Sequence, residues 1–363
     1  MRTLRIDVSE EWAQHERGDA MNSRERVLRA IQFDTPDRVP IGYSINPGAL
    51  LRHGQKLIDL CTRYPHDFFD PAEVIRMPER DTANYREDGS YYKELTDEWG
   101  CTWVCYKEGI SGEVKRSPLD DWSKLEDYRF PPVPNASPEE RAPARETTKQ
   151  QMERFIGWGA AGSLFEQMQW LRGVEKMMMD IALDCEEAYL LVDRMMDEWI
   201  VPHIELALEA GAEAIGFGDD WGTQERLLIN PKSWREIFKP RYQRAIDLAH
   251  EGGALTWLHS DGMILEILPD LIEIGLDVIN PQLSCLNLDA LRSITDHRIC
   301  VYTDMDRQFI LPRGTPAQVR EHVRDAHSCL ASPDGGLIWG AGIYEDVPFE
   351  NIEALLEAFV EFG

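Results

Sequence analysis

Residues 254–282 read ALTWLHSDGMILEILPDLIEIGLDVINPQ. An apolar run over residues 254–258 ends in polar residues, a helical pattern follows at once, and a second apolar run leads to Asn280. Two short apolar runs joined by a helix are typical of neighbouring strands in a parallel sheet. The stretch therefore predicts a strand–helix–strand unit.

The same rhythm extends along the C-terminal two thirds of the chain. Further apolar runs are FIGWGAA (155–161), AEAIGFGDD (212–220), RICVYTDMD (298–306) and GGLIWGAG (335–342), with helical patterns between them. Such alternation implies a parallel sheet that is either doubly wound or closed as a barrel. No glycine-rich dinucleotide fingerprint follows any of these runs. The sequence therefore predicts an α/β fold of the (β/α)8 TIM-barrel type.

Two regions differ from this pattern. Residues 1–20 are charged and poorly patterned, and we interpret them as an N-terminal extension before a single barrel domain over residues 21–363. That domain is expected to begin with a helix capped by Asn22 or Ser23. Residues 84–134 alternate aromatic and polar side chains around an Asp-Gly turn and then become rich in proline and acid. We expect an inserted β-hairpin there, acting as a lid or as a structural element.

Composition limits the partners of this chain. The formal net charge is −27 over 363 residues, which argues against nucleic acid and anionic membranes as partners. No stretch is long and apolar enough to span a bilayer, and no signal peptide is present, so the expected location is the cytoplasm. The seven cysteines are odd in number and scattered, so we expect no disulfide framework. A small-molecule ligand is the expected partner.

Polar residues follow four successive apolar runs, at the points where the predicted strands end. Barrel enzymes build their sites from the carboxyl ends of strands, although Asp and Asn are also common caps of the helices that follow. The recurrence favours a site over capping alone. The residues concerned are Asp219 and Asp220, His259 and Asp261, Asn280 and Gln282, and Asp304 and Asp306.

His259 and Asp261 are the centre of the expected site, because alternation along a strand directs residues two apart to the same face. Three interpretations remain open. The pair could hold a metal, with Asp219 or Asp220 as the nearest further ligand and Asp304, Asp306 or Glu225 as other candidates. It could act as an acid–base pair. In the third interpretation Asp261 caps a helix and His259 fills a polar pocket.

Other candidates rest on weaker patterns. Tyr43 ends the first predicted strand and could line the cleft, and Trp221 could stack on a flat ligand or pack in the core. The expected catalytic residues are His259, Asp261, Asp219, Asp220 and Tyr43, with His259 and Asp261 also the expected metal ligands. The expected cofactor-binding residues are Trp221, Asn280, Gln282 and Asp304.

Several longer segments resemble the uroporphyrinogen decarboxylase (URO-D) superfamily, which includes the cobalamin- and corrinoid-dependent methyltransferases. The resemblance extends over most of residues 21–363 and implies a (β/α)8 barrel with a deep cleft at its carboxyl face. The segments that carry it are MNSRERVLRAIQFDTPDRVP (21–40), LLINPKSWREIFKPRYQRAIDLAHEGGALTWLHSDG (227–262), ILPDLIEIGLDVINPQ (267–282), LPRGTPAQVREHV (311–323) and GGLIWGAGIYEDVPFENIEALLEAF (335–359).

The resemblance implies two possible chemistries, and the chain departs from the pattern of each. Decarboxylases of this superfamily carry an arginine-rich segment after the first strand, whereas PIGYSINPGALLRHG (40–54) has a single arginine, Arg52. Methyltransferases carry a zinc site of one histidine and two cysteines. His259 matches the histidine, and Asp261 and Ala341 stand where the cysteines are expected. A His/Asp site is harder than one with two thiolates and suits an oxygen ligand.

The expected function is therefore a corrinoid-linked methyltransferase that acts on a small methylated or methoxylated compound. The resemblance implies a corrinoid (cobalamin) carried by a partner protein, with zinc and tetrahydrofolate as further candidate cofactors and a homodimer as one candidate assembly. The first alternative is a decarboxylase, a lyase of tetrapyrrole metabolism that needs no cofactor. The second is a barrel that binds a corrinoid or tetrapyrrole without catalysis.

Overall fold

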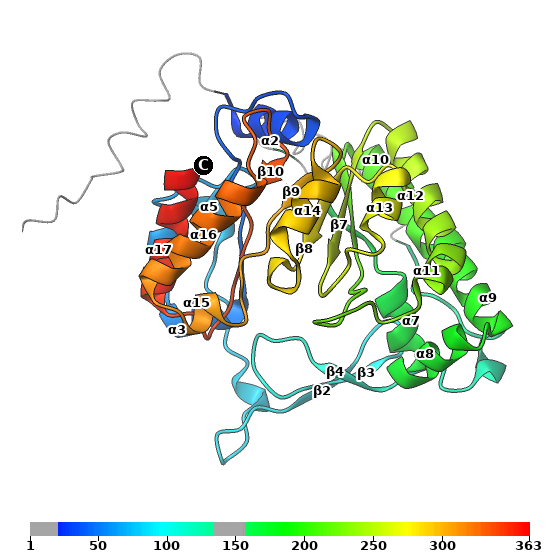
Figure 1. Ribbon diagram of the computed structural model, residues 1–363. Coiled ribbons are helices and arrows are strands. Elements are labelled where there is room, and N and C mark those ends of the chain that lie inside the picture. Colours follow the sequence, from blue (N-terminus) through cyan, green and yellow to red (C-terminus); the bar gives the residue numbers. More distant parts are fainter. Residues whose placement is uncertain (1–20, 134–154, 156) are drawn as a thin grey trace, which may run out of the picture.

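The computed structural model describes residues 21–133, 155 and 157–363, and all structural statements concern these ranges. The expected N-terminal extension, residues 1–20, lies outside them, as does the last residue of the expected insertion. The described chain forms a parallel sheet surrounded by helices (Figure 1).

Six strands form one parallel sheet in the order β10-β9-β8-β7-β6-β5. Each of them lies in one of the six apolar runs, and their spatial order follows the chain. The predicted strand–helix alternation is therefore confirmed. The strands are β5 (Gly157–Gly162), β6 (Ala214–Gly218), β7 (Leu255–Ser260), β8 (Val278–Pro281), β9 (Cys300–Tyr302) and β10 (Leu337–Ile338).

A second parallel pairing extends this arrangement at the β10 end. Strand β1 (Ser44–Ile45) pairs with β11 (Gly342–Ile343), and Ile41 forms a parallel bridge with Trp339. Because β10 and β11 are successive parts of residues 337–343, this segment pairs with β9 through its first half and with β1 through its second. The strand order is TIM-barrel-like, although no strand pairing joins β5 to β1 within the described ranges.

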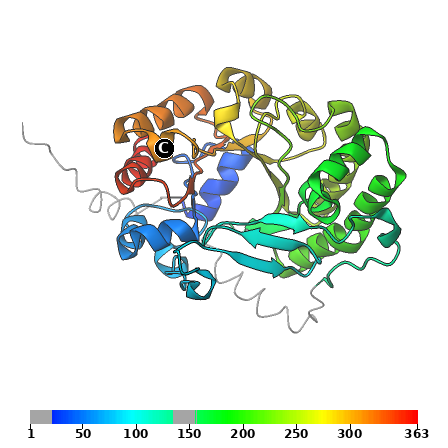
Figure 2. The same ribbon diagram turned by 90° about the horizontal axis from the view of Figure 1, so that it is seen from below.

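Helices follow the strands and cover the outside of the sheet (Figures 1 and 2). They are α2 (Ser23–Gln32), α3 (Pro47–His53), α4 (Gln55–Cys61), α5 (Pro71–Val74), α7 (Phe165–Arg172), α8 (Val174–Ala182), α9 (Glu186–Met195), α10 (Val201–Ala210), α11 (Pro231–Ile237), α12 (Lys239–Glu251), α13 (Leu268–Glu273), α14 (Leu288–Thr295), α15 (Ile310–Arg313), α16 (Pro316–Leu330) and α17 (Phe349–Phe362). None of these helices is long and apolar enough to cross a membrane.

Helix α2 begins as the sequence predicts and seals one end of the sheet. The side chain of Asn22 accepts a hydrogen bond of 2.8 Å from the backbone N–H of Glu25, which satisfies a donor of the first turn. The buried face of α2, with Val27 and Ile31, packs in one apolar cluster with Val278 of β8. This packing leaves the opposite, carboxyl ends of the strands for a site.

The predicted insertion is an antiparallel sheet of three strands, β2 (Lys93–Thr96), β3 (Thr102–Cys105) and β4 (Glu113–Arg116). The Asp-Gly turn closes only a small bridge between Tyr85 and Tyr91, whereas the β2–β3 turn is formed by residues 97–101. The hairpin predicted around the Asp-Gly turn is therefore present as this small bridge, whereas the three-stranded sheet after it was not predicted. A Gly-containing turn at Gly100, where φ is +80°, forms the longer hairpin.

This small sheet lies below the strand ends in Figure 1 and contacts two sides of the main body. The ring centroids of Trp103 and of Trp170 on α7 are 5.2 Å apart. After β3, Lys107 forms an ion pair with Glu345, which follows β11. The sheet therefore reaches from α7 to the β11–α17 connection, as a lid would.

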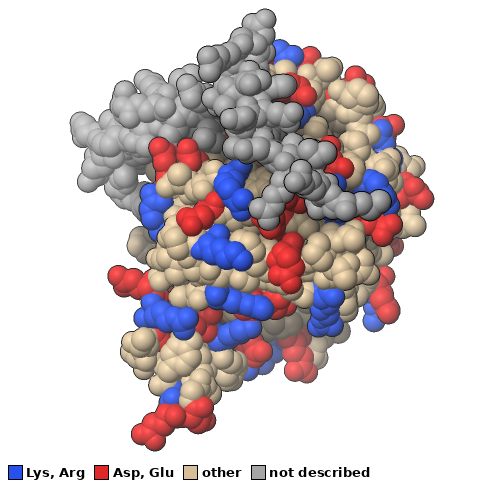
Figure 3. All heavy atoms as spheres, turned by 90° about the vertical axis from the view of Figure 1, so that its left-hand side faces the viewer, with Lys and Arg blue, Asp and Glu red and all other residues tan. Residues whose placement is uncertain are grey.

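The acidic excess does not form a uniform surface. On the face that carries α16 and α17, Lys and Arg side chains occur among Asp and Glu side chains (Figure 3). Many of these charges form exposed pairs, such as Arg63 with Glu353 at 3.3 Å. Exposed pairs of this kind contribute little to stability, so we assign this face no role beyond solvation.

Candidate active site

The register of the parallel sheet brings three strand ends together. Gly218 of β6 lies opposite His259 of β7, and His259 lies opposite Asn280 of β8. Residues that leave these strands in the next one or two positions therefore meet at the same edge. Asp220 and Asp261 are two such residues.

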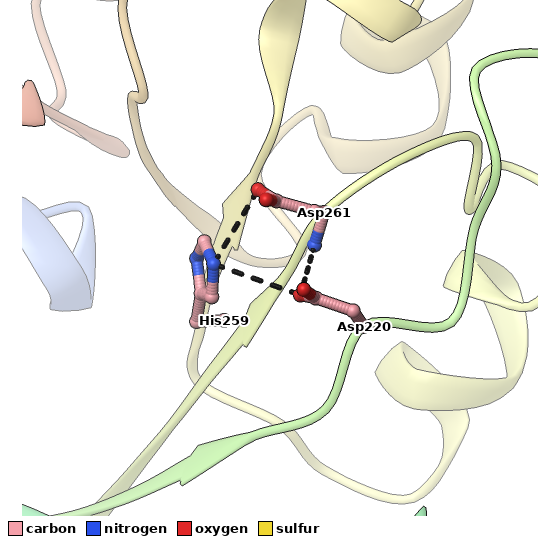
Figure 4. Close-up of side chains that lie close together, drawn as sticks. All are labelled: Asp220, His259 and Asp261. Carbon is pink, nitrogen blue, oxygen red and sulfur yellow. Dashed lines mark hydrogen bonds and ion pairs between the residues drawn. The ribbon is translucent and has the colours of Figure 1, made fainter. Parts of the chain in front are cut away.

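Asp220, His259 and Asp261 form a cluster of potential metal ligands (Figure 4). The Nε2 atom of His259 lies 3.5 Å from Oδ1 of Asp261 and 3.8 Å from Oδ1 of Asp220. The backbone N–H of Asp261 also donates to Oδ1 of Asp220 at 2.8 Å, which holds the two aspartates together. Within the described ranges, this is the group of three or more His, Cys, Asp or Glu residues whose ligand atoms converge.

The separations in this cluster are longer than hydrogen bonds. An N–H···O bond spans about 2.7–3.2 Å, so Nε2 makes a good hydrogen bond with neither carboxylate. Two ligand atoms that each lie about 2.1 Å from one zinc ion are roughly 3.4 Å apart at a tetrahedral angle. The distances of 3.5 and 3.8 Å suit ligands of a shared ion.

The side chain of Asn280 fixes the tautomer of the His259 ring. Its Nδ2 donates to the carbonyl oxygens of Tyr302 and Thr303, at 2.8 and 3.1 Å, so its Oδ1 faces Nδ1 of His259 at 2.8 Å. Oδ1 can only accept, so Nδ1 carries the hydrogen. In the neutral ring, Nε2 then presents its lone pair to the two aspartates. That is the tautomer a metal ligand requires.

Asp261 is held from its other side by Arg307, which follows β9. The guanidinium of Arg307 forms an ion pair with Oδ2 of Asp261 and lies 3.2 Å from Oδ2 of Asp304. Burial raises the pKa of Asp261, the charge of Asp220 adds to this, and Arg307 opposes it. The Oδ1 atom of Asp261 is buried and has no hydrogen-bond partner among the described residues. A buried oxygen without a protein partner is costly unless a water or an ion satisfies it, so Oδ1 is available to an ion.

A cavity of about 210 Å³ opens beside His259. Its volume is below the range of roughly 300–1,000 Å³ that is usual for sites of drug-sized ligands, so it suits a smaller molecule. Polar side chains make up most of its lining. The lining residues are Ser44, His259, Asn280, Tyr302, Thr303, Asp304, Arg307, Ala341, Gly342 and Tyr344.

Asp219 and Asp220 are adjacent in sequence but have different surroundings. Asp219 is fully buried, and its oxygens accept from the backbone N–H groups of Leu164 and Glu166 at 2.9 Å each, and from the Tyr242 hydroxyl. Burial raises the pKa of Asp219 to about 7, against these hydrogen bonds. Asp219 therefore anchors the start of α7, whereas Asp220 faces His259.

Glu166 is a site residue that we did not expect from the sequence. It lies in the first turn of α7, where Asp219 holds its backbone. Burial raises the pKa of Glu166 to about 8, and the charges of Asp220 and Asp219 add to this. Glu166 therefore holds its proton to a higher pH than an ordinary glutamate does.

Of the other residues that the sequence predicted for the site, some line the cavity and others are buried away from it. Asn280 and Asp304 line the cavity, as a ligand-binding role requires. Trp221 is fully buried and stacks on Phe165 with ring centroids 4.4 Å apart, which agrees with the core interpretation. Tyr43 is buried, and its hydroxyl lies 3.4 Å from the carbonyl oxygen of Cys61.

The side chains of Gln282 and Asp306 accept hydrogen bonds from backbone N–H groups. The Oε1 atom of Gln282 accepts from the N–H of Gly262 at 2.9 Å, which supports the turn after Asp261. Oδ1 of Asp306 accepts from the N–H groups of Gln308 and Phe309, so Asp306 caps a turn as the alternative interpretation of the strand ends proposed.

Arg307, Tyr344 and Ser44 line the cavity but were not predicted. The strand-end residues predicted from the sequence are carboxylates, an imidazole and amides, and Arg307 directly follows one of them, Asp306. The same strand-end rule, applied to all polar types and to β5, would have found both Arg307 and Glu166.

Comparisons with known proteins agree with this fold. A curated uroporphyrinogen decarboxylase from Actinobacillus succinogenes is 24% identical over 201 residues, which cover 52% of this chain and 52% of that protein. The chain thus matches about half the length of this relative. A solved methyltransferase from Methanosarcina mazei superposes with a TM-score of 0.61 at 19% identity, over 94% of this chain and 99% of that one. At this identity, the structural likeness concerns the fold.

The sequence profile of the family described as "Uroporphyrinogen decarboxylase (URO-D)" matches residues 95–362. This range includes the three residues of the cluster, the cavity residues after β7 and two of the lid strands, β3 and β4. The predicted resemblance is therefore confirmed, and the chain belongs to the URO-D family.

Proposed function

We propose that this protein is a metal-dependent methyltransferase that moves a methyl group between a small methylated or methoxylated compound and a corrinoid carried by a partner protein. The observation that carries the proposal is the convergence of Asp220, His259 and Asp261. The distances from Nε2 of His259 to the two carboxylates are too long for hydrogen bonds and close to the separation of two ligands of one ion. A tetrahydrofolate-type compound is a further candidate acceptor.

The residues of the cluster fit a divalent ion. Asp261 has a buried oxygen without a partner, and Asn280 prepares Nε2 of His259 as a ligand. Two carboxylates and one imidazole suit zinc or a harder divalent ion in a catalytic site that leaves a position open for substrate. A bound ion of this kind would act as a Lewis acid toward a substrate oxygen.

The cavity supports a small substrate. Its volume of about 210 Å³ is below that of a usual site for a drug-sized ligand, which favours a small substrate over a tetrapyrrole. His259 belongs both to the cluster and to the cavity lining, so a methoxy oxygen bound there would lie beside the ligands. The corrinoid would have to approach from outside. The TIM-barrel-like strand order supports, as part of this proposal, a closed (β/α)8 barrel with the site at its carboxyl face.

The chain's own residues have defined tasks in this proposal. Asp220, His259 and Asp261 hold the ion, and Asn280 keeps the histidine in the required tautomer. Ser44 and Tyr344, which also line the cavity, offer hydroxyl groups to the substrate.

A decarboxylase that acts on an organic acid is the second candidate. The family profile and the curated relative favour it, and Arg307 provides a cation for a substrate carboxylate. The local charges argue against a decarboxylase, because the positive charge of Arg307 is already paired with the carboxylates of Asp261 and Asp304. Among the described residues that line the cavity, Arg307 is the single arginine or lysine.

The test uses the purified protein loaded with Zn²⁺ and mixed with methylcob(III)alamin and candidate acceptors, or with reduced cobalamin and methoxylated donors. Methyl transfer changes the visible absorption of the corrinoid, and His259→Ala should abolish the change. Release of carbon dioxide from uroporphyrinogen or a smaller acid, without any change of the corrinoid, would favour the decarboxylase. Tight corrinoid binding without turnover would favour a non-catalytic binding protein.

A further inference from the structure

The side chain of Arg307 contacts one carboxylate oxygen of Asp261 and not the other. It lies 46 residues after Asp261 in the chain, yet its guanidinium pairs with Oδ2 of Asp261 and leaves Oδ1 free. The free Oδ1 is the atom that faces Nε2 of His259 at 3.5 Å. The two oxygens of this carboxylate therefore have separate environments.

We propose that Arg307 is a positioning residue, which occupies one oxygen of Asp261 so that the other is presented alone to the metal. The inference rests on the proposed function, because it concerns how the cluster receives its ion. A carboxylate with both oxygens free can bind an ion through either or both of them. Arg307 removes this choice and so preserves an open position for substrate.

The surroundings of Arg307 support this assignment. A guanidinium presents several N–H donors in a fixed plane, so it can hold two carboxylates at once. Here it lies between Asp261 and Asp304, and its centre is 5.9 Å from the ring centroid of Tyr344. The side chain is 19% exposed, so solvent competes little for its donors. Loss of the guanidinium would free Asp261 to rotate.

The experiment compares Co²⁺ binding by wild type, Arg307→Met and Arg307→Lys. Cobalt serves as the probe because its visible spectrum reports the number and type of its ligands. We expect the Co²⁺ affinity of Arg307→Met to fall about 10- to 100-fold, the usual effect of removing a group that orients a ligand, and its visible band to change shape. Arg307→Lys retains one cationic donor and should recover part of the affinity.

Arg235→Met is the matched control. Arg235 pairs with Asp270 at 2.9 Å outside the cluster, so its loss should leave Co²⁺ binding and the spectrum unchanged. Equal or tighter Co²⁺ binding by Arg307→Met would overturn the inference, and so would a loss that Arg307→Lys does not reduce at all, since that would indicate a packing defect. If wild type itself binds no Co²⁺ or Zn²⁺, the proposed function fails instead.

Discussion

Nδ1 of His259 lies 2.8 Å from Oδ1 of Asn280, on the neighbouring strand of the same sheet. Because the amide of Asn280 donates to two backbone carbonyls, its oxygen must receive the Nδ1 hydrogen of the ring. This one contact decides that Nε2 is the atom presented to Asp220 and Asp261. The chemistry of the site follows from it.

Asn280→Ala should lower the affinity for Zn²⁺ about 10- to 100-fold, because His259 would no longer be held in one tautomer and orientation. Competition with a chromophoric chelator measures the affinity. Asn287→Ala is the control. Asn287 caps α14 through a 2.9 Å bond to the N–H of Ala290, so this variant should lose about 1 kcal/mol of unfolding free energy and no metal affinity. Equal metal affinity in Asn280→Ala and wild type would refute the role of Asn280.

Asp219 and Asp220 should respond differently to the same change. Asp220→Asn removes a charged ligand, so the purified protein should lose stoichiometric metal while its unfolding free energy changes little. Asp219→Asn disturbs a buried carboxylate that holds the start of α7, which should cost about 1–3 kcal/mol of unfolding free energy. Metal analysis and urea unfolding of the two variants test this contrast. The reverse pattern would exchange the assigned roles.

Glu166→Gln should change how stability depends on pH. The pKa of Glu166 is raised to about 8 in the folded chain, so the folded state holds a proton that the unfolded state releases above its ordinary pKa. The unfolding free energy of the metal-free wild type should therefore fall as pH rises from the ordinary pKa of a glutamate to about pH 8. Glutamine cannot ionise, so the variant should lose less stability over the same window.

Urea unfolding of both chelator-treated proteins at pH 5 and pH 9 measures this difference. Asp219 also has a raised pKa, but it is present in both proteins, so the comparison isolates Glu166. Parallel stability profiles for wild type and Glu166→Gln would show that Glu166 titrates normally.

Trp221→Ala should act on stability. The ring is fully buried and stacked on Phe165, so its truncation should cost about 3–5 kcal/mol of unfolding free energy. Trp221→Phe should cost less, because an aromatic ring remains. The measurement is urea unfolding, with Zn²⁺ affinity as the second reading. A variant of normal stability that binds a corrinoid or substrate more weakly would instead support the ligand-stacking role.

Much of the fold could be predicted because periodicity is a local signal. The six apolar runs became strands in their chain order, and Asn22 capped the first helix as its position suggested. The three-stranded form of the inserted sheet was not predicted. The Asp-Gly sequence is the stronger local turn signal, but the pairing of Thr102 to Cys105 with both neighbouring strands placed the main turn at Gly100.

The centre of the site was predicted for a similar reason. Alternation along one strand placed His259 and Asp261 together, and the strand-end rule brought Asp220 and Asn280 to them. The sequence alone does not give the direction in which each of these side chains points. Asp219 and Asp220 look alike in sequence, and only the packing of α7 and Tyr242 separates a buried anchor from a residue of the cluster.

Metal analysis of the purified protein tests whether Asp220, His259 and Asp261 hold an ion. We expect about one divalent ion per chain in wild type, and none after His259→Ala or Asp261→Asn, with the folded structure of each variant verified by circular dichroism. The exposed pair of His250 and Asp277, 2.8 Å apart, provides the control, because His250→Ala should retain the ion. A wild-type protein that transfers methyl groups after complete removal of metal, or an ion retained by His259→Ala, would contradict the account.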